Sequence, residues 1–210
     1  MGGSDWSRPS NPLTMKRSKI TMLIGALLLL SLFVFPMWGI ILKAPQYPVP
    51  IGMNIWINKI TDKNPNDIQN INIMNHYVGM EKIPEFIPEF RIFPPIVLFM
   101  SALGILFAFM GKRSLFLLWF ILMIMLGTAG MYDFYLWEYD YGHNLKENAA
   151  IKFTDEKGEP MAYQPPLIGS KMILNFEAIS MPRLGAYLLF LGMALSLVAF
   201  RMNKKEEALE

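Results

Sequence analysis

Four long stretches without a charged residue constrain the fold of this chain more than any other feature. They contain 23, 18, 19 and 17 residues and cover positions 20–42, 93–110, 114–132 and 184–200. A helix needs roughly 20 apolar residues, with about 17 as the lower limit, to cross a hydrocarbon core about 30 Å thick. We therefore expect four transmembrane helices, with three spans and one re-entrant segment as the alternative.

The first stretch also follows a basic segment, as the apolar part of a signal peptide does. Lys16, Arg17 and Lys19 precede it. Its apolar length, however, exceeds the roughly 7–15 residues that are usual in signal peptides, and no small-residue cleavage motif follows it. We expect it to remain as a helix, with a kink tolerated at Pro36.

These spans predict an all-α integral membrane protein. It would be a four-helix transmembrane bundle with two structured extracytoplasmic loops that form an outer cap. The predicted layout is a cytoplasmic tail (1–19), a first span (20–42), an outer loop (43–92), a second span (93–110), a cytoplasmic turn (111–113), a third span (114–132), a second outer loop (133–183), a fourth span (184–200) and a cytoplasmic tail (201–210).

Basic residues predict the orientation, because cytoplasmic segments of membrane proteins carry an excess of lysine and arginine. The two tails and the short turn hold nine basic and four acidic residues. The two long loops hold ten basic and thirteen acidic residues. We therefore expect both termini to be cytoplasmic and both long loops to lie on the outer side.

The composition excludes several classes of protein. The chain has no cysteine, which rules out disulfide scaffolds, zinc fingers, iron–sulfur proteins and thiol enzymes. Its 53% hydrophobic residues and net charge of only +2 exclude a disordered chain. It has no long basic stripe of the kind that binds nucleic acid. The predicted spans also contain no Asp, Glu, Lys, Arg or His, which argues against an ion pump or a proton-coupled transporter.

The first outer loop predicts one helix and two elements on the membrane surface. The helix begins near Asn64, where Pro65 and Asp67 suit a helix start, and ends at Gly79. The near-repeat at 83–90 and the apolar stretch around Trp56 are the predicted surface elements.

His76 lies in the last turn of that predicted helix, with Met74 and Met80 on either side of it. An imidazole with thioether ligands suits copper and needs no cysteine. The alternative is that the histidine only stabilises the carbonyl end of its helix.

The second outer loop opens with acidic and aromatic residues in alternation, from Tyr132 to Leu145. If the third helix continues, Asp133 and Asp140 share a face, and Gly142 ends the helix and turns His143 back toward them. A carboxylate beside a histidine is either a metal site with its orienting partner or a satisfied hydrogen-bond network. If the two loops pack together, the predicted metal ligands are His76, His143, Asp133, Asp140, Met74 and Met80.

The strings at 75–80, 133–145 and 163–176 resemble a family of small bacterial membrane proteins. Those proteins are encoded in the gene clusters for nitrous oxide respiration, near the maturation genes of the copper enzyme. The resemblance covers the outer loops and the adjoining helices. It implies a location in the bacterial inner membrane and a role in copper-enzyme biogenesis or electron supply, without a defined reaction.

Three functions follow from these observations. The first is an accessory protein that binds copper at the periplasmic face and passes it to a periplasmic or membrane partner. The second is a non-catalytic membrane anchor or interaction subunit of a larger respiratory or transport complex. The third is an enzyme or a quinol-linked electron-transfer subunit, which is the least favoured because no catalytic motif is present.

Overall fold

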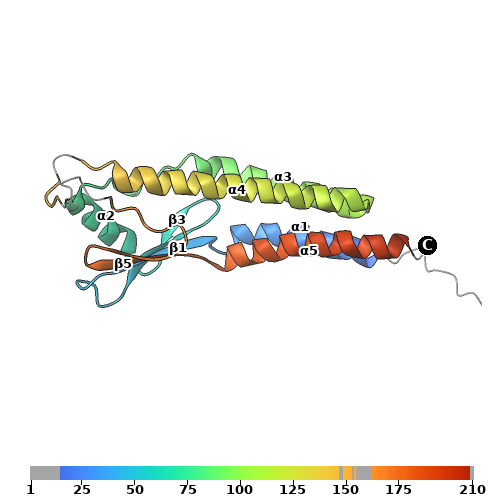
Figure 1. The fold of residues 1–210 in the computed structure, drawn as a ribbon, viewed down its shortest axis with the longest axis horizontal. Helices are drawn as coiled ribbons and strands as arrows, with labels where there is room; N and C mark the ends of the chain where they lie inside the picture. Colours follow the sequence, from blue (N-terminus) through green and yellow to red (C-terminus); the bar gives the residue numbers. More distant parts are fainter. Residues whose placement is uncertain (1–14, 147–148, 153, 155–161, 209–210) are drawn as a thin grey trace, which may run out of the picture.

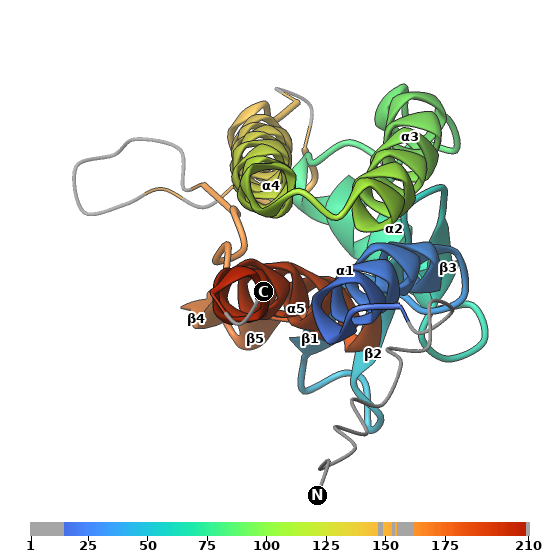
Figure 2. The same cartoon turned by 90° about the vertical axis from the view of Figure 1, so that its right-hand side faces the viewer.

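The computed structural model of the chain describes residues 15–146, 149–152, 154 and 162–208. The protein is elongated, with helices side by side along most of its length and a β-sheet at one end (Figure 1). In the end view the long helices form two layers, α3 with α4 and α1 with α5 (Figure 2). Much of the predicted first tail (1–19) and the end of the second (201–210) lie outside the described residues.

The fold is mixed α/β, so the prediction of an all-α four-helix bundle is wrong. The helices are α1 (Arg17–Leu28), α2 (Asp67–Val78), α3 (Glu89–Met110), α4 (Arg113–His143) and α5 (Leu184–Glu207), and a short 3₁₀ helix, Leu29–Phe33, continues α1. The strands are β1 (Trp38–Lys43), β2 (Ile51–Ile55), β3 (Ile60–Asp62), β4 (Gly169–Ile173) and β5 (Phe176–Pro182).

The error begins in the first apolar stretch, which is not a single helix. Helical structure ends at Phe33, and β1 begins at Trp38. Pro36 lies between them; it cannot donate a backbone hydrogen bond and disrupts a helix that continues through it. The β-branched pair Ile40 and Ile41 then favours an extended chain. A strand buried on both faces has the same continuous apolar sequence as a helix, so hydropathy did not separate the two.

Among the described residues, three helices are long and apolar enough to cross a membrane: α3, α4 and α5. α1 has 12 residues and is too short to do so by itself. The chain is therefore consistent with a multi-pass membrane protein that has three candidate spans, not four. α4 has 31 residues and measures about 46 Å, so about 16 Å of it extends beyond a hydrocarbon core.

The sheet joins the two loops that we predicted to form a cap. It is antiparallel, with strand order β3-β2-β1-β5-β4. β1 is the central strand: Trp38 pairs with Ile55 of β2 on one side and with Pro182 of β5 on the other. The apolar stretch around Trp56 therefore forms strands β2 and β3 and is not a surface element.

α2 confirms the predicted short helix and packs on this sheet. Gly79 follows it in the left-handed conformation (φ +82°), as a closing glycine should. Asp67 is buried, and its carboxylate accepts hydrogen bonds from the backbone N–H groups of Gly52 (2.9 Å) and Asn64 (2.8 Å). The start of α2 is thus fastened to β2. We call the sheet, α2 and the end of α4 the cap.

The opposite end of the molecule brings together the start of α1, the α3–α4 turn and the end of α5 (Figure 1). The hydroxyl of Ser18 donates to the carboxylate of Glu206 at 2.5 Å. The amide of Asn203 donates to the carbonyl of Gly111 at 3.2 Å, and the ammonium of Lys19 donates to the carbonyl of Phe109 at 3.0 Å. The segments predicted to be cytoplasmic therefore share one end, away from the cap.

Candidate functional site

A cavity of about 640 Å³ lies in the cap, between one face of the sheet and the helices α2 and α4. We call it the cap cavity. Alternate residues of β1, Ile40 and Leu42, form part of its floor, with Met53 of β2 and Ala178 of β5 beside them. Both outer loops therefore contribute to a single site, as the prediction that they pack together required. Its walls are mostly apolar.

Glu138 is the most unusual residue of the cap cavity. Its side chain is fully buried, and neither carboxyl oxygen has a hydrogen-bond partner among the described residues. It lies on the face of α4 that also carries Phe134 and Tyr141, one turn before and one turn after it. Burying a carboxyl without a partner costs free energy, so such a group is more often found at a functional site than as a source of stability.

Gly142, one turn after Glu138, allows another segment of the chain to approach α4 closely. α4 continues through Gly142 to His143, so the prediction that Gly142 ends the helix is wrong. A Cβ atom at position 142 would lie 2.5 Å from the backbone nitrogen of Gln164. The returning loop can therefore approach the helix closely, and the N–H of Tyr163 donates to the carbonyl of Gly142 at 2.9 Å.

Three thioether side chains line the same cavity. Met53 comes from β2 and is 5% exposed, Met74 comes from α2, and Met80 follows the glycine that closes α2. Methionine sulfur is a soft, uncharged ligand. Three methionines and one buried glutamate thus line one mostly apolar space.

Two further polar residues hold the wall of the cavity in place. The side-chain amide of Asn75 donates to the carbonyl of Glu81 at 3.1 Å, and the hydroxyl of Tyr141 donates to the same carbonyl. These contacts tie α2, the segment that leads to α3 and the end of α4 to one point. Asn75 and Tyr141 are therefore positioned by the fold, although both line the cavity.

The structure brings together only two of the six predicted metal ligands, Met74 and Met80. His76 is exposed, and its ring lies beside Tyr77. His143 is exposed and stacks on Tyr139 at 4.0 Å, with Nδ1 2.8 Å from the carbonyl oxygen of that tyrosine. Asp140 is exposed, and Asp133 lines a different cavity. Among the described residues, no three His, Asp or Glu side chains form a group that could hold a metal ion.

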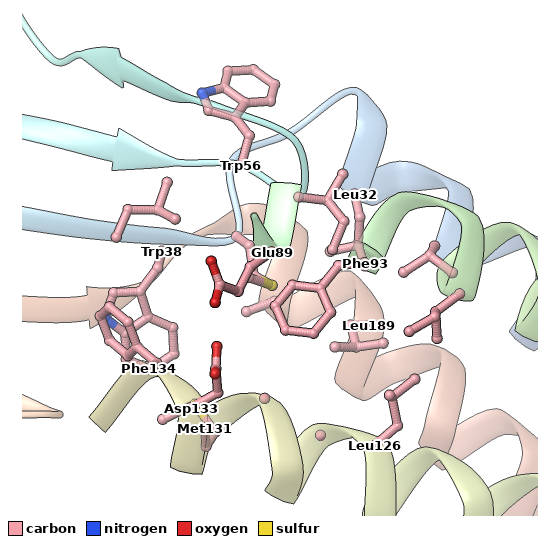
Figure 3. A pocket seen from close by; sticks show the side chains of 18 of the residues that line it. Leu32, Trp38, Trp56, Glu89, Phe93, Leu126, Met131, Asp133, Phe134 and Leu189 are labelled. Carbon is pink, nitrogen blue, oxygen red and sulfur yellow. The ribbon is translucent and has the colours of Figure 1, made fainter. Parts of the chain in front are cut away.

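That second cavity, of about 480 Å³, lies between the two layers of helices, below the sheet. We call it the interlayer cavity. Its walls come from α3, α4, α5, the 3₁₀ helix and the first strands. At its sheet end the carboxyl groups of Glu89 and Asp133 point toward each other, beside Trp38 and Phe134 (Figure 3).

Sequence reasoning missed Glu138, Met53 and Glu89. A signal for Glu138 exists, because Phe134, Glu138 and Tyr141 recur at helical spacing and Phe134 and Tyr141 are apolar enough to face a core. The sequence analysis instead expected the face of this helix that carries Asp133 and Asp140 to supply the metal ligands. Met53 lies in a segment that we did not predict as a strand, so the sequence did not indicate toward which face its side chain points.

Comparison with known proteins gives no independent information about this site. No family model, no curated protein and no solved structure matches the chain.

Proposed function

We propose that this protein is a membrane accessory protein that binds and handles copper at the extracytoplasmic face, through the cap cavity. The observation that supports the proposal is that Met53, Met74 and Met80 line the same cavity as Glu138, a buried carboxyl that has no hydrogen-bond partner among the described residues. The resemblance described above implies the same setting, and the candidate spans would keep the cap at the membrane surface.

The chemistry of these ligands fits Cu(I) better than harder cations. Thioethers bind Cu(I) well, whereas Mg²⁺ and Ca²⁺ prefer oxygen ligands. A monovalent ion would be balanced by the single carboxylate of Glu138, so that the buried site carries no net charge. The copper is cargo in this proposal, and transfer to a periplasmic or membrane partner is the step that it serves.

Competition for Cu(I) tests the proposal. The full chain in detergent is titrated against a chromophoric Cu(I) chelator, and the double variant Met74→Leu, Met80→Leu is compared with it. Leucine conserves volume and removes both sulfurs, so the fold should persist. We expect the double variant to bind Cu(I) at least roughly 10- to 100-fold more weakly. Loss of a residue that only supports a metal ligand already has an effect of this size.

Two variants serve as controls. Met172→Leu removes a thioether that is 64% exposed and lies outside the cavity, and it should leave the affinity unchanged. His76→Ala with His143→Ala should also leave it unchanged, because both rings are exposed. Loss of Cu(I) binding in the histidine variant, with binding retained in the methionine variant, would instead support the ligand set predicted from the sequence. No stoichiometric binding to any form of the chain would contradict a copper function.

A non-catalytic anchor for a larger complex is the second candidate function. The part of α4 at and beyond the membrane boundary carries a row of exposed apolar and aromatic side chains, Tyr132, Tyr135, Leu136 and Tyr139. Aromatic residues of this kind are enriched at protein interfaces. A partner that remains bound to the chain when the cap-cavity methionines are replaced would favour this function.

A further inference from the structure

The interlayer cavity has the dimensions and position of a binding site for a lipid-soluble molecule. Its volume of about 480 Å³ lies within the range of small-molecule sites. Asp133 is 20 residues beyond the start of α4, which places it about 30 Å along that helix. Because the hydrocarbon core is also about 30 Å thick, the acidic end of the cavity lies at the cap-side boundary of the membrane.

The two carboxyl groups at that end have no polar partner in the part of the chain that the structure describes. Neither the Glu89 nor the Asp133 side chain forms a hydrogen bond or an ion pair there, and the charges of the two carboxyl groups repel each other. They come from different helices, α3 and α4, and point into the same space (Figure 3). A group that donates a hydrogen bond to both would remove the repulsion and satisfy both acceptors.

The remainder of the cavity is apolar, and its sheet end is aromatic. Trp38 and Phe134 pack edge to face with ring centroids 5.8 Å apart. The indole N–H of Trp38 already donates to the hydroxyl of Ser180 at 2.7 Å, so this ring offers the cavity an apolar surface. A flat aromatic head group suits such a wall.

Space for a tail continues along α4. A Cβ atom added at Gly127 or Gly130 would meet no atom within 4 Å, and both glycines line the cavity. Gly25 and Gly192 allow α1 and α5 to approach each other closely, whereas Gly127 and Gly130 face open space.

We propose that the interlayer cavity binds an isoprenoid hydroquinone, with its ring hydroxyls donating to Asp133 and Glu89 and its tail beside α4. Hydrogen-bond complementarity selects this class, because two acceptors without partners require a ligand with two donors. Phospholipid phosphates and fatty-acid carboxylates carry negative charge and would be repelled by the two acids. A hydroquinone is neutral, carries its donors on a flat ring and has an otherwise apolar body. The proposal concerns binding, and it does not depend on copper in the cap cavity.

The test uses the full chain in phosphatidylcholine nanodiscs and a short-tailed menaquinol as the probe, titrated by calorimetry in its reduced and oxidised forms. The reduced form donates two hydrogen bonds, whereas the oxidised form only accepts them. We expect saturable binding of the reduced form that is about tenfold tighter or more than that of the oxidised form. Asp133→Asn with Glu89→Gln should remove this preference, and Glu85→Gln, an exposed acid outside the cavity, should retain it.

A second variant separates the head-group site from the space for the tail. Gly127→Leu fills open space and replaces glycine with a better helix former, so the helix should remain folded. It should abolish binding of both redox forms, and thermal unfolding confirms the fold. Equal affinities for the two forms, binding that survives Gly127→Leu, or saturable binding of dodecylammonium in place of the hydroquinone would overturn the proposal. Intact Cu(I) binding in these variants shows that the two sites are independent.

Discussion

Glu138 shows how a single side chain can be costly for the fold and useful for a site. It is fully buried, and neither of its oxygens has a partner among the described residues. Its neighbours in the cap cavity include Met74 and Met80, whose thioethers have no hydrogen to donate to a carboxylate. A residue kept under these conditions is expected to stabilise a bound ligand rather than the empty protein.

Replacement of Glu138 by leucine should therefore make the protein more stable and less able to bind. An unsatisfied buried polar group costs about 1–3 kcal/mol, and leucine removes this cost while filling a similar volume. We expect a higher midpoint of thermal unfolding in detergent, together with weaker Cu(I) binding.

Glu85→Leu is the matched control because Glu85 is exposed, and its midpoint should change little. A lower midpoint for the Glu138 variant would show that the carboxyl has a stabilising partner in the folded protein. Unchanged Cu(I) affinity would remove the carboxyl from the proposed site.

At the scale of elements, β1 decides the architecture. It lies between β2 and β5, and so it joins a hairpin from the first outer loop to a hairpin from the second. Lys43 of β1 pairs with Glu177 of β5, and Glu177 pairs in turn with Met172 of β4. The ammonium of Lys43 lies 3.1 Å from the carboxylate of Glu177. The Lys43 side chain is exposed and that of Glu177 is partly exposed, so this ion pair contributes little to stability.

The register of β1 can be tested with disulfides, because the chain has no cysteine of its own. Lys43→Cys with Glu177→Cys should cross-link on mild oxidation, since directly paired residues have Cα atoms about 5.5 Å apart. Lys43→Cys with Met172→Cys should not, because two strand spacings of about 4.8 Å exceed the reach of a disulfide. A gel-shift assay under non-reducing conditions measures both, and cross-linking of neither pair would contradict the sheet.

At the scale of the whole molecule, the two ends differ in structure and in charge. The cap gathers both outer loops, whereas the other end holds the α3–α4 turn and the end of α5, tied together by Asn203 and Gly111. Lysine and arginine are concentrated at that second end. Because cytoplasmic segments carry this bias, we expect the cap to lie on the outer side.

Labelling of single cysteines in intact cells tests this orientation. Lys112→Cys and Lys204→Cys should react with a membrane-impermeant maleimide only after the cells are lysed. Lys171→Cys, on an exposed part of β4, should react in intact cells once the outer membrane is permeable. The reverse pattern would place the cap in the cytoplasm and would be incompatible with a periplasmic role.

The sequence by itself determined the apolar helices α3, α4 and α5 and the short helix α2 with its closing glycine. These features depend on local properties, namely hydropathy over a long window and the conformational preferences of glycine, and both can be read from the chain. Only the tertiary structure decided that residues 38–43 form a strand, because an apolar run suits a buried helix and a central strand equally well. Pairing with Ile51–Ile55 and Phe176–Pro182 is what selects the strand. It also decided which polar residues face inward. Glu138 lies buried in the wall of the cap cavity, whereas His76 and His143 are exposed, because the burial of a side chain depends on which face of its helix the sheet covers.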